Sequence, residues 1–390
     1  MPAGIPSGEL FPTDSPIPPA DLIGRGEAVE ALAGQLTAHM HRIVAGPRRT
    51  GKTSVCEAAV DRLRREGAYV VAVDLFEQAT LGEFAEALTL ELVRNRAPAR
   101  RALERLRRSG RTLAEAGATT VSARLASELG EEVEISWRPG MAERDPGRYF
   151  DWALRALQKV AKADDRRVIL FIDEFQEIAR ERRPYGDPES VAKRMRAVLQ
   201  RSRRVTCLFA GSLEHLMRDL FTPRQRAFYR FGGFFALPPI APEAWSEGLS
   251  ARFAAGGCTI DGHALDELVT LGEGHPRATM LIAQQAHAAA LADRARRVDL
   301  GRVRHGLVLA MAADAASLDS DVERIRSLGK NSLSLARLVA RGERPYGASE
   351  VPPAAVGRAL DALRGAGYLE HRQRGDWQVI DPLLRRRLSR

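Results

Sequence analysis

The stretch Gly-Pro-Arg-Arg-Thr-Gly-Lys-Thr at residues 46–53 constrains the fold of this chain more than any other. Its GxxxxGK[ST] pattern is that of a phosphate-binding loop. An apolar run at residues 41–45 precedes it, and a helical pattern follows from Thr53 to Arg65. In a strand–loop–helix setting, successive backbone N–H groups and the helix N-terminus can hold phosphate oxygens. We therefore expect a P-loop fold that binds a nucleoside triphosphate.

The lysine of this loop is an unusual cation for the chain. Only five of the 59 basic residues are lysines, and the other 54 are arginines. A compact ammonium reaches the β- and γ-phosphates, whereas a planar guanidinium does not replace it there. We expect Lys52 to bind the nucleotide and to assist catalysis. The loop residues expected to bind nucleotide are Gly46, Pro47, Arg48, Arg49, Thr50, Gly51, Lys52, Thr53 and Ser54.

A second motif places two carboxylates at the end of an apolar run. Val168–Ile172 is followed directly by Asp173 and Glu174. Ligands of open α/β folds bind at this edge of the sheet. Asp173 would hold Mg²⁺ through water beside the Thr53 hydroxyl, and Glu174 would polarise the attacking water as the catalytic base. The alternative is an acidic helix start, where carboxylates are also favourable. The Asp-Glu pair indicates hydrolysis.

Three further positions are candidates for the site. Ser212, after the fourth apolar segment, could sense the γ-phosphate and position water, or cap the helix that follows. Arg230 could act as an arginine finger, in the same chain or in a second copy. His275, Pro276 and Arg277 open a helix and could contact the nucleotide, or could form an ordinary helix start.

Five short apolar segments have strand character, with β-branched or aromatic residues and helical patterns between them. They are typical of a parallel sheet buried on both faces. The segments are His41–Ala45, Tyr69–Leu75, Val168–Ile172, Val205–Ala210 and Phe234–Leu237. The fold class is therefore α/β. The Arg-rich stretch at 95–145 is a family-specific insertion whose role stays open.

The chain divides into four parts by composition and pattern. Residues 1–20 carry six prolines and are expected to form a flexible or surface-draped arm. Residues 21–240 form the P-loop core. Residues 241–318 form a helical lid, with helices near 242–255, 262–272, 276–295 and 298–314. Residues 325–390 form the last domain.

The last domain has the pattern of a winged helix-turn-helix. Its elements are a helix at Ser332–Arg341, a tight element at 348–351, a helix at Pro353–Ala366 and a hairpin of Tyr368–His371 with Trp377–Ile380. In the DNA-binding mode the third helix enters the major groove and the wing touches the backbone. The candidate contacts to double-stranded DNA are Arg358, Arg364, Arg372 and Arg374. Such modules also dock on proteins, which leaves two alternatives.

Composition narrows the functional classes. The net charge of +9 is compatible with nucleic-acid binding, although the arginine bias also fits a GC-rich genome. Three scattered cysteines favour neither a disulfide framework nor a metal site. The start lacks the pattern of a secretory signal, and no apolar run is long enough to span a bilayer. We therefore expect a cytoplasmic protein without membrane contact.

Taken in order, these motifs resemble the STAND branch of P-loop ATPases, and most closely the archaeal-type ATPase family, which is related to AAA+ origin-binding initiators. The resemblance covers nearly the whole chain after residue 20. The matching pieces are Ile23-Gly24-Arg25, Gly46 to Thr53, Phe171 to Phe175, Gly211-Ser212, Tyr229-Arg230, Gly274 to Pro276, and Gly367-Tyr368 with Asp381-Pro382-Leu383. It implies an ASCE-type core, a helical lid and a winged helix, with ATP and Mg²⁺ as cofactors.

The resemblance also implies site residues. Ile23, Gly24 and Arg25 would lie near the adenine, and the 274–276 turn would contact the nucleotide from the lid. Two departures stand out. Gly26 and Glu27 displace the acid that usually follows the first arginine directly. Arg277 is basic where many relatives are apolar, and it is similar to the second sensor of AAA+ initiators.

We therefore expect Mg²⁺-dependent ATP binding and hydrolysis that drives a conformational switch associated with DNA through the winged helix. The alternative is a signalling or defence switch whose winged helix docks on protein. A third hypothesis, a P-loop scaffold with little turnover, is disfavoured by Glu174. We expect ATP hydrolysis to be slow unless a protein partner or a further copy of the chain completes the site.

Overall fold

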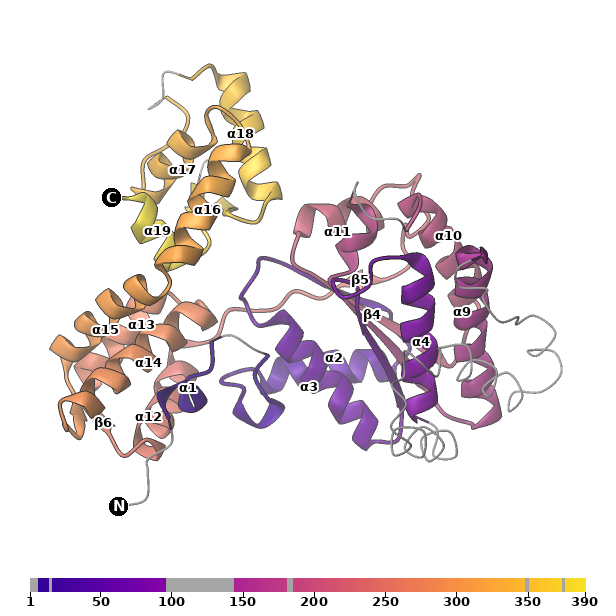
Figure 1. The fold of residues 1–390 in the computed structure, drawn as a ribbon, viewed down its shortest axis with the longest axis horizontal. Helices are drawn as coiled ribbons and strands as arrows, with labels where there is room; N and C mark the ends of the chain where they lie inside the picture. The colour runs from indigo at the N-terminus through magenta and orange to yellow at the C-terminus, as the bar shows by residue number, and fades with distance from the viewer. Residues whose placement is uncertain (1–5, 14–15, 96–143, 181–184, 348–350, 374–375) are drawn as a thin grey trace.

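The computed structural model describes residues 6–13, 16–95, 144–180, 185–347, 351–373 and 376–390 (Figure 1). The insertion expected at 95–145 lies almost wholly outside these residues. Figure 1 shows a sheet with helices on both sides, a group of lid helices, and a C-terminal unit that stands on the lid beside the core. None of the helices in the described ranges combines the length and apolar character that crossing a membrane requires.

The core sheet has five parallel strands in the order β2-β3-β4-β1-β5. They are β1 (Arg42–Ala45), β2 (Tyr69–Asp74), β3 (Val168–Asp173), β4 (Val205–Gly211) and β5 (Gly233–Phe234). The predicted α/β class and strand positions are confirmed, except that β5 ends at Phe234 instead of continuing to Leu237. Because β4 lies between β1 and β3, the ends of these three strands bring the P loop, Ser212 and the acidic pair to one edge.

Side chains alternate between the two faces of this sheet, as the strand period of two requires. One face packs on α2 (Gly26–Thr37) and α3 (Lys52–Arg65) through residues such as Val44 and Ile169. The other packs through residues such as Ile43 and Leu170 on a second set of helices. That set is α4 (Leu81–Asn95), α9 (Pro146–Ala163), α10 (Pro188–Leu199) and α11 (Glu214–Phe221). The helix expected from Phe175 is a single 3₁₀ turn, η2 (Phe175–Ala179).

The four expected lid helices are present, with a pair of two-residue parallel strands beside them. They are α12 (Pro242–Ala255), α13 (Gly262–Gly272), α14 (Pro276–Ala292), α15 (Leu300–Ala313), β6 (Thr259–Ile260) and β7 (Arg297–Val298).

Of the two alternatives predicted for the N-terminal segment, a flexible or a surface-draped arm, the described residues fit the second. The segment contains α1 (Ser7–Leu10) and η1 (Pro19–Asp21). Leu10 and Phe11 are buried among the lid helices, where the Phe11 ring lies 4.9 Å from that of Phe253. Burial of these two apolar side chains anchors the segment to the lid, which composition alone did not indicate.

The C-terminal unit consists of helices and a hairpin. Its elements are α16 (Ala315–Ser327), α17 (Ser332–Ala340), α18 (Pro353–Gly365), the antiparallel strands β8 (Leu369–Gln373) and β9 (Asp376–Val379), and α19 (Pro382–Leu388). The expected helices and hairpin are present, whereas most of the 348–351 element lies outside the described residues. Residues 318–325, where the sequence indicated a boundary between domains, lie within α16. The buried side chains of the lid and this unit form one continuous cluster.

Gly211, the last residue of β4, allows a close approach at the active edge. A Cβ there would lie 2.5 Å from Gln176 Oε1 and 2.6 Å from Met217 Sδ. Gly211→Ala should therefore lower the free energy of unfolding by about 1–3 kcal/mol through overpacking. Gly34→Ala, on the exposed side of α2 with no atom within 4 Å, is the control and should stabilise slightly. Urea unfolding of both variants tests this, and equal midpoints would contradict it.

Candidate active site

The P loop joins β1 to α3 and has the shape of an anion cradle. Gly51, the residue before α3, has φ +84°, a left-handed conformation that favours glycine, and Arg49 has φ +64°. The Gly46 N–H donates to the carbonyl of Gly211 at 3.3 Å, which ties the start of the loop to the end of β4. The free amides at the start of α3 face the loop, an arrangement suited to phosphate.

Lys52, the first residue of α3, is buried with 7% of its surface exposed. Burial lowers the pKa of Lys52 to about 8, while Glu174 and Asp173 act in the opposite direction. Its ammonium donates to the carbonyl of Pro47 within the loop. A buried ammonium is costly without anionic partners, and phosphate oxygens would supply them.

Thr53 and Asp173 meet at the strand edge, as the two motifs predict. The Thr53 hydroxyl donates to Asp173 Oδ2 at 2.8 Å, and the Glu174 N–H donates to Asp173 Oδ1 at 2.9 Å. Burial raises the pKa of Asp173, and the bond from Thr53 opposes this rise. A hydroxyl and a carboxylate are hard oxygen donors that suit Mg²⁺. Within the described ranges no group of three or more His, Cys, Asp or Glu residues could hold a metal ion.

Glu174 is held in a left-handed conformation, φ +48°, that is strained for a residue other than glycine. Its carboxylate accepts two hydrogen bonds at Oε2, one from the Ser212 hydroxyl at 2.8 Å and one from the amide of Gln176. Gln176 also donates to Ser212 at 3.3 Å and is fully buried. These contacts fix the orientation of the carboxylate. Sequence reasoning missed Gln176, whose only signal was its place two residues after Glu174.

A cavity of about 280 Å³ opens beside these groups. The P loop, the acidic strand, the lid and the N-terminal segment all line it. Its lining residues are Pro12, Thr13, Pro16, Ile17, Arg48, Arg49, Gly51, Lys52, Thr53, Ser54, Glu174, Ser212, Pro276, Arg277 and Met280. The Ile17 N–H donates to the Ser54 hydroxyl at 3.0 Å, so the N-terminal segment closes one wall. No pattern in the sequence predicted that the N-terminal segment would line this cavity.

The three residues expected near the adenine do not line this cavity. Ile23 packs into the lid cluster, and Gly24, with φ +60°, lies close to Ile240 and Ala244. Arg25 is buried and donates to the carbonyls of Pro238 and, at 3.3 Å, Thr50. Burial lowers the pKa of Arg25 to about 10. These residues brace the P loop against the link to the lid.

The lid residues divide between the cavity and the lid interior. Pro276 and Arg277 line the cavity, and Arg277 forms a two-bond ion pair with Asp314 at 2.6 and 2.7 Å. His275 is buried outside the lining, and its Nδ1 accepts from the N–H of Ala278 at 3.2 Å as the cap of α14. Burial lowers the pKa of His275. In this structure His275 therefore belongs to an ordinary helix start, the alternative to a nucleotide contact.

The remaining arginine candidates lie away from the cavity. Arg230 is exposed, with its guanidinium 5.2 Å from the centre of the Tyr229 ring. Arg358 is exposed on α18, and Arg364 pairs with Asp361 at 2.9 Å. The side chain of Arg372 and all of Arg374 lie outside the described residues.

Comparisons with known proteins agree with this geometry. Residues 21–184 match the family model described as an AAA ATPase domain. The Walker-type ATPase of Pyrococcus abyssi has a similar fold, with a TM-score of 0.68, 17% identity, and coverage of 98% of this chain and 100% of that one. The ORC2 protein of Aeropyrum pernix, in ADPNP and ADP complexes, has a TM-score of 0.58 and 16% identity, with coverage of 97% of this chain and 95% of that one. The ADP form of the same protein has a TM-score of 0.53 and 14% identity, with coverage of 98% of this chain and 99% of that one. No curated protein sequence matches the chain.

The family match covers both the P loop and the acidic pair, and the fold likeness extends over nearly the whole chain. Residues 21–184 are similar to an AAA ATPase domain, and the chain is a P-loop ATPase.

Proposed function

We propose that this ATPase binds ATP with Mg²⁺, hydrolyses it to ADP and phosphate, and uses the bound nucleotide to control docking of its C-terminal unit on the P loop. In the chemical step, a water oxygen bonds to the γ-phosphorus while the bond from that phosphorus to the β–γ bridging oxygen breaks. Glu174 accepts the proton of the water, held in place by Ser212 and Gln176. Lys52 and the amides at the start of α3 stabilise the charge on the phosphates.

The oxygen donors of Thr53 and Asp173 would hold Mg²⁺ at the phosphates. The ion would neutralise charge on the phosphate oxygens when bound. In this proposal the hydroxyl of Ser212 keeps the Glu174 carboxylate aimed at the water, and the lid residues Pro276 and Arg277 cover the cavity. Arg230, exposed in this structure, would act on the site of a second copy if it acts as a finger.

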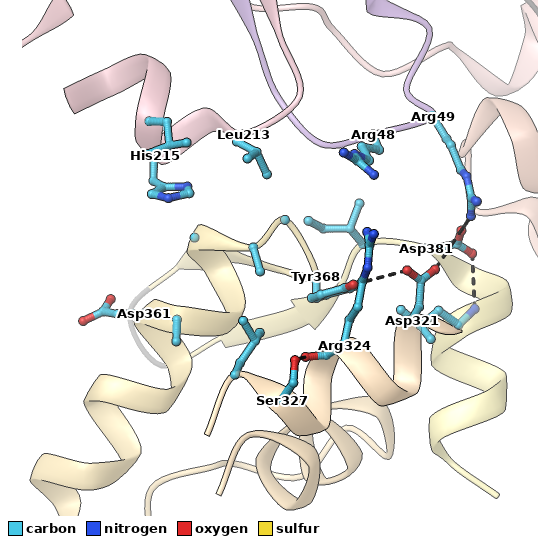
Figure 2. Close-up of a pocket in the computed structure, with 18 of the residues that line it drawn as sticks. Arg48, Arg49, Leu213, His215, Asp321, Arg324, Ser327, Asp361, Tyr368 and Asp381 are labelled. Atoms are coloured by element: carbon cyan, nitrogen blue, oxygen red, sulfur yellow. Dashed lines mark hydrogen bonds and ion pairs between the residues drawn. The ribbon is translucent and has the colours of Figure 1, made fainter. Parts of the chain in front are cut away.

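One observation carries the switch: the P-loop residue Arg49 is bonded to the C-terminal unit (Figure 2). Its guanidinium donates to the Ser317 hydroxyl at 2.9 Å and lies 3.9 Å from Asp321 and 3.7 Å from Asp381. Burial raises the pKa of Asp321, and Arg49 opposes that rise. We call these contacts the Arg49 latch. Because Arg49 also lines the nucleotide cavity, a triphosphate would compete with the two carboxylates for its charge.

In the latched state α18 faces the core. The His215 ring of α11 lies beside Gly365 near the end of α18, and Asp361 and Ala362 line the space between the two parts. Release of the latch would expose this end of α18. As a winged helix of STAND type, the freed unit would present Arg358 and Arg364 to double-stranded DNA, or dock on a protein partner if DNA does not bind.

The double variant Asp321→Asn/Asp381→Asn tests the switch and replaces no residue that lines the nucleotide cavity. Asp381 caps the N-terminus of α19, and an asparagine at position 381 can also cap it, so the C-terminal unit should stay folded. Loss of about 1–2 kcal/mol from the partly exposed ion pairs should raise amide exchange in α18 about 5- to 30-fold. ATP should have the same effect on the parent protein, and duplex DNA affinity should rise with release.

The matched control is Asp319→Asn, which removes an ion pair to Arg387 inside the C-terminal unit. It should leave the exchange of α18 unchanged. Equal exchange in the parent and the double variant would refute the latch. Exchange that rises without any gain in DNA affinity would assign the freed unit to a protein partner.

A further inference from the structure

A second cavity, of about 540 Å³, lies between the core and the C-terminal unit (Figure 2). The P loop and the segment before α11 form its upper wall in that view, and α16, α18 and the Tyr368 region form the lower wall. Arg48 points into it from the P loop, and Arg324 extends toward it from α16. Its size falls in the range of small-molecule sites.

Most charged side chains that line this cavity already have partners. Arg49 pairs with Asp321 and Asp381, Arg180 pairs with Glu177, and Asp361 pairs with Arg364. In the part of the chain that the structure describes, neither Arg48 nor Arg324 has an ion pair. Arg48 and Arg324 therefore enter the cavity from opposite walls without a direct ion pair, and Arg324 lies within electrostatic reach of the Asp321 carboxylate.

The guanidinium groups of Arg48 and Arg324 both influence the Tyr368 hydroxyl. Both lower the pKa of Tyr368, which burial and Asp321 together raise to about 12. Arg48 and Arg324 therefore lie close to one phenol, although they belong to different parts of the fold. Asp321, which accepts from the Tyr368 hydroxyl at 3.2 Å, offsets part of this positive charge, and an anionic ligand would offset more of it.

The rest of the lining is largely apolar. Leucine and isoleucine side chains come from both walls of the cavity: Leu213, Leu216, Leu328, Ile380 and Leu384. Two guanidinium groups without a direct ion pair among the described residues, beside apolar walls, suit a ligand with an anionic head and an apolar body.

We propose that this cavity binds a small phosphate-bearing molecule with an apolar body, its phosphate between Arg48 and Arg324. A phosphate monoester carries a charge of about −1.5 to −2 at neutral pH and three acceptor oxygens, so it can bond to both guanidinium groups at once, which a single carboxylate does less well. Duplex DNA is far too wide for a space of this volume. Such a ligand would contact the P loop and α16 at once, so it would hold the C-terminal unit in the docked state. This inference goes beyond ATP hydrolysis and does not require it.

Phenyl phosphate is the probe, measured by calorimetry on the full chain. The Lys52→Ala background removes anion binding at the nucleotide cavity, and the parent saturated with ADP provides a second measurement if that variant does not fold. We expect saturable binding at one site, about tenfold tighter than for inorganic phosphate because the ring is buried. Arg324→Gln should weaken it about 10- to 100-fold, since it removes a charged hydrogen-bond donor.

Arg326→Gln is the matched control, on the same helix but exposed and outside the cavity. It should change phenyl phosphate affinity by less than about twofold. Absence of saturable binding in both protein samples would overturn the proposal. So would equal losses in the Arg324 and Arg326 variants, or equal affinities for phenyl phosphate and inorganic phosphate.

Discussion

Lys52→Ala should weaken ATP binding by about 10²- to 10³-fold, because it removes the charged hydrogen bonds of the ammonium to the phosphates. Lys52 is buried at the start of α3 and lines the 280 Å³ cavity beside Glu174. Among the residues that the structure describes, no other lysine lines that cavity. Titration with a fluorescent ATP analogue measures the loss. Lys52→Arg should restore little of it, because a broad planar guanidinium does not fit the place of a compact ammonium.

The control for this variant is Lys162→Ala. Lys162 is an exposed lysine in the last turn of α9, and its removal should leave the affinity for ATP unchanged. If Lys52→Ala binds ATP as tightly as the parent, the P loop is not the nucleotide site.

Glu174→Gln should lower the turnover of ATP by about 10²- to 10⁴-fold while leaving its binding intact. The amide oxygen of glutamine can still accept from Ser212 and Gln176, so the geometry should persist while the proton acceptor is lost. Steady-state phosphate release measures the effect. Glu66→Gln, at an exposed position after α3, is the control and should keep the parental turnover.

The two halves of the candidate site were predictable from sequence because each is local. The P loop lies between one strand and one helix, and the acidic pair ends another strand. A parallel sheet brings such ends to a common edge, so the contact of Thr53 with Asp173 follows from the fold class. The approach of Ser212 to Glu174 follows in the same way from the place of β4.

The contacts that sequence could not reveal join segments far apart in the chain. Arg49 meets Ser317, 268 positions away, and no local pattern marks either residue for the other. The cavity wall at Ile17 depends on Leu10 and Phe11 being buried in the lid. The composition of this proline-rich segment predicts an arm and does not reveal that these two side chains anchor it. Arg25, expected near the adenine, also contacts the distant carbonyls of Pro238 and Thr50, and its place at the nucleotide stays a prediction.

The basic C-terminus shows why charge counts say little about function by themselves. Arg385 and Arg386 pair with Glu273 of the lid, and Arg387 pairs with Asp319 of α16. These cations hold the last helix in place. The sequence indicated a cluster of positive charge but not its internal partners.

The most direct test of the account is a single-turnover experiment, in which an excess of protein binds a stoichiometric amount of ATP and bound nucleotide is followed over time. The parent should convert the bound ATP to ADP and phosphate, while Glu174→Gln should hold it as ATP over the same period. Phosphate release from Glu174→Gln at the parental rate would contradict the assignment of Glu174 as the base, and with it the hydrolytic site described here.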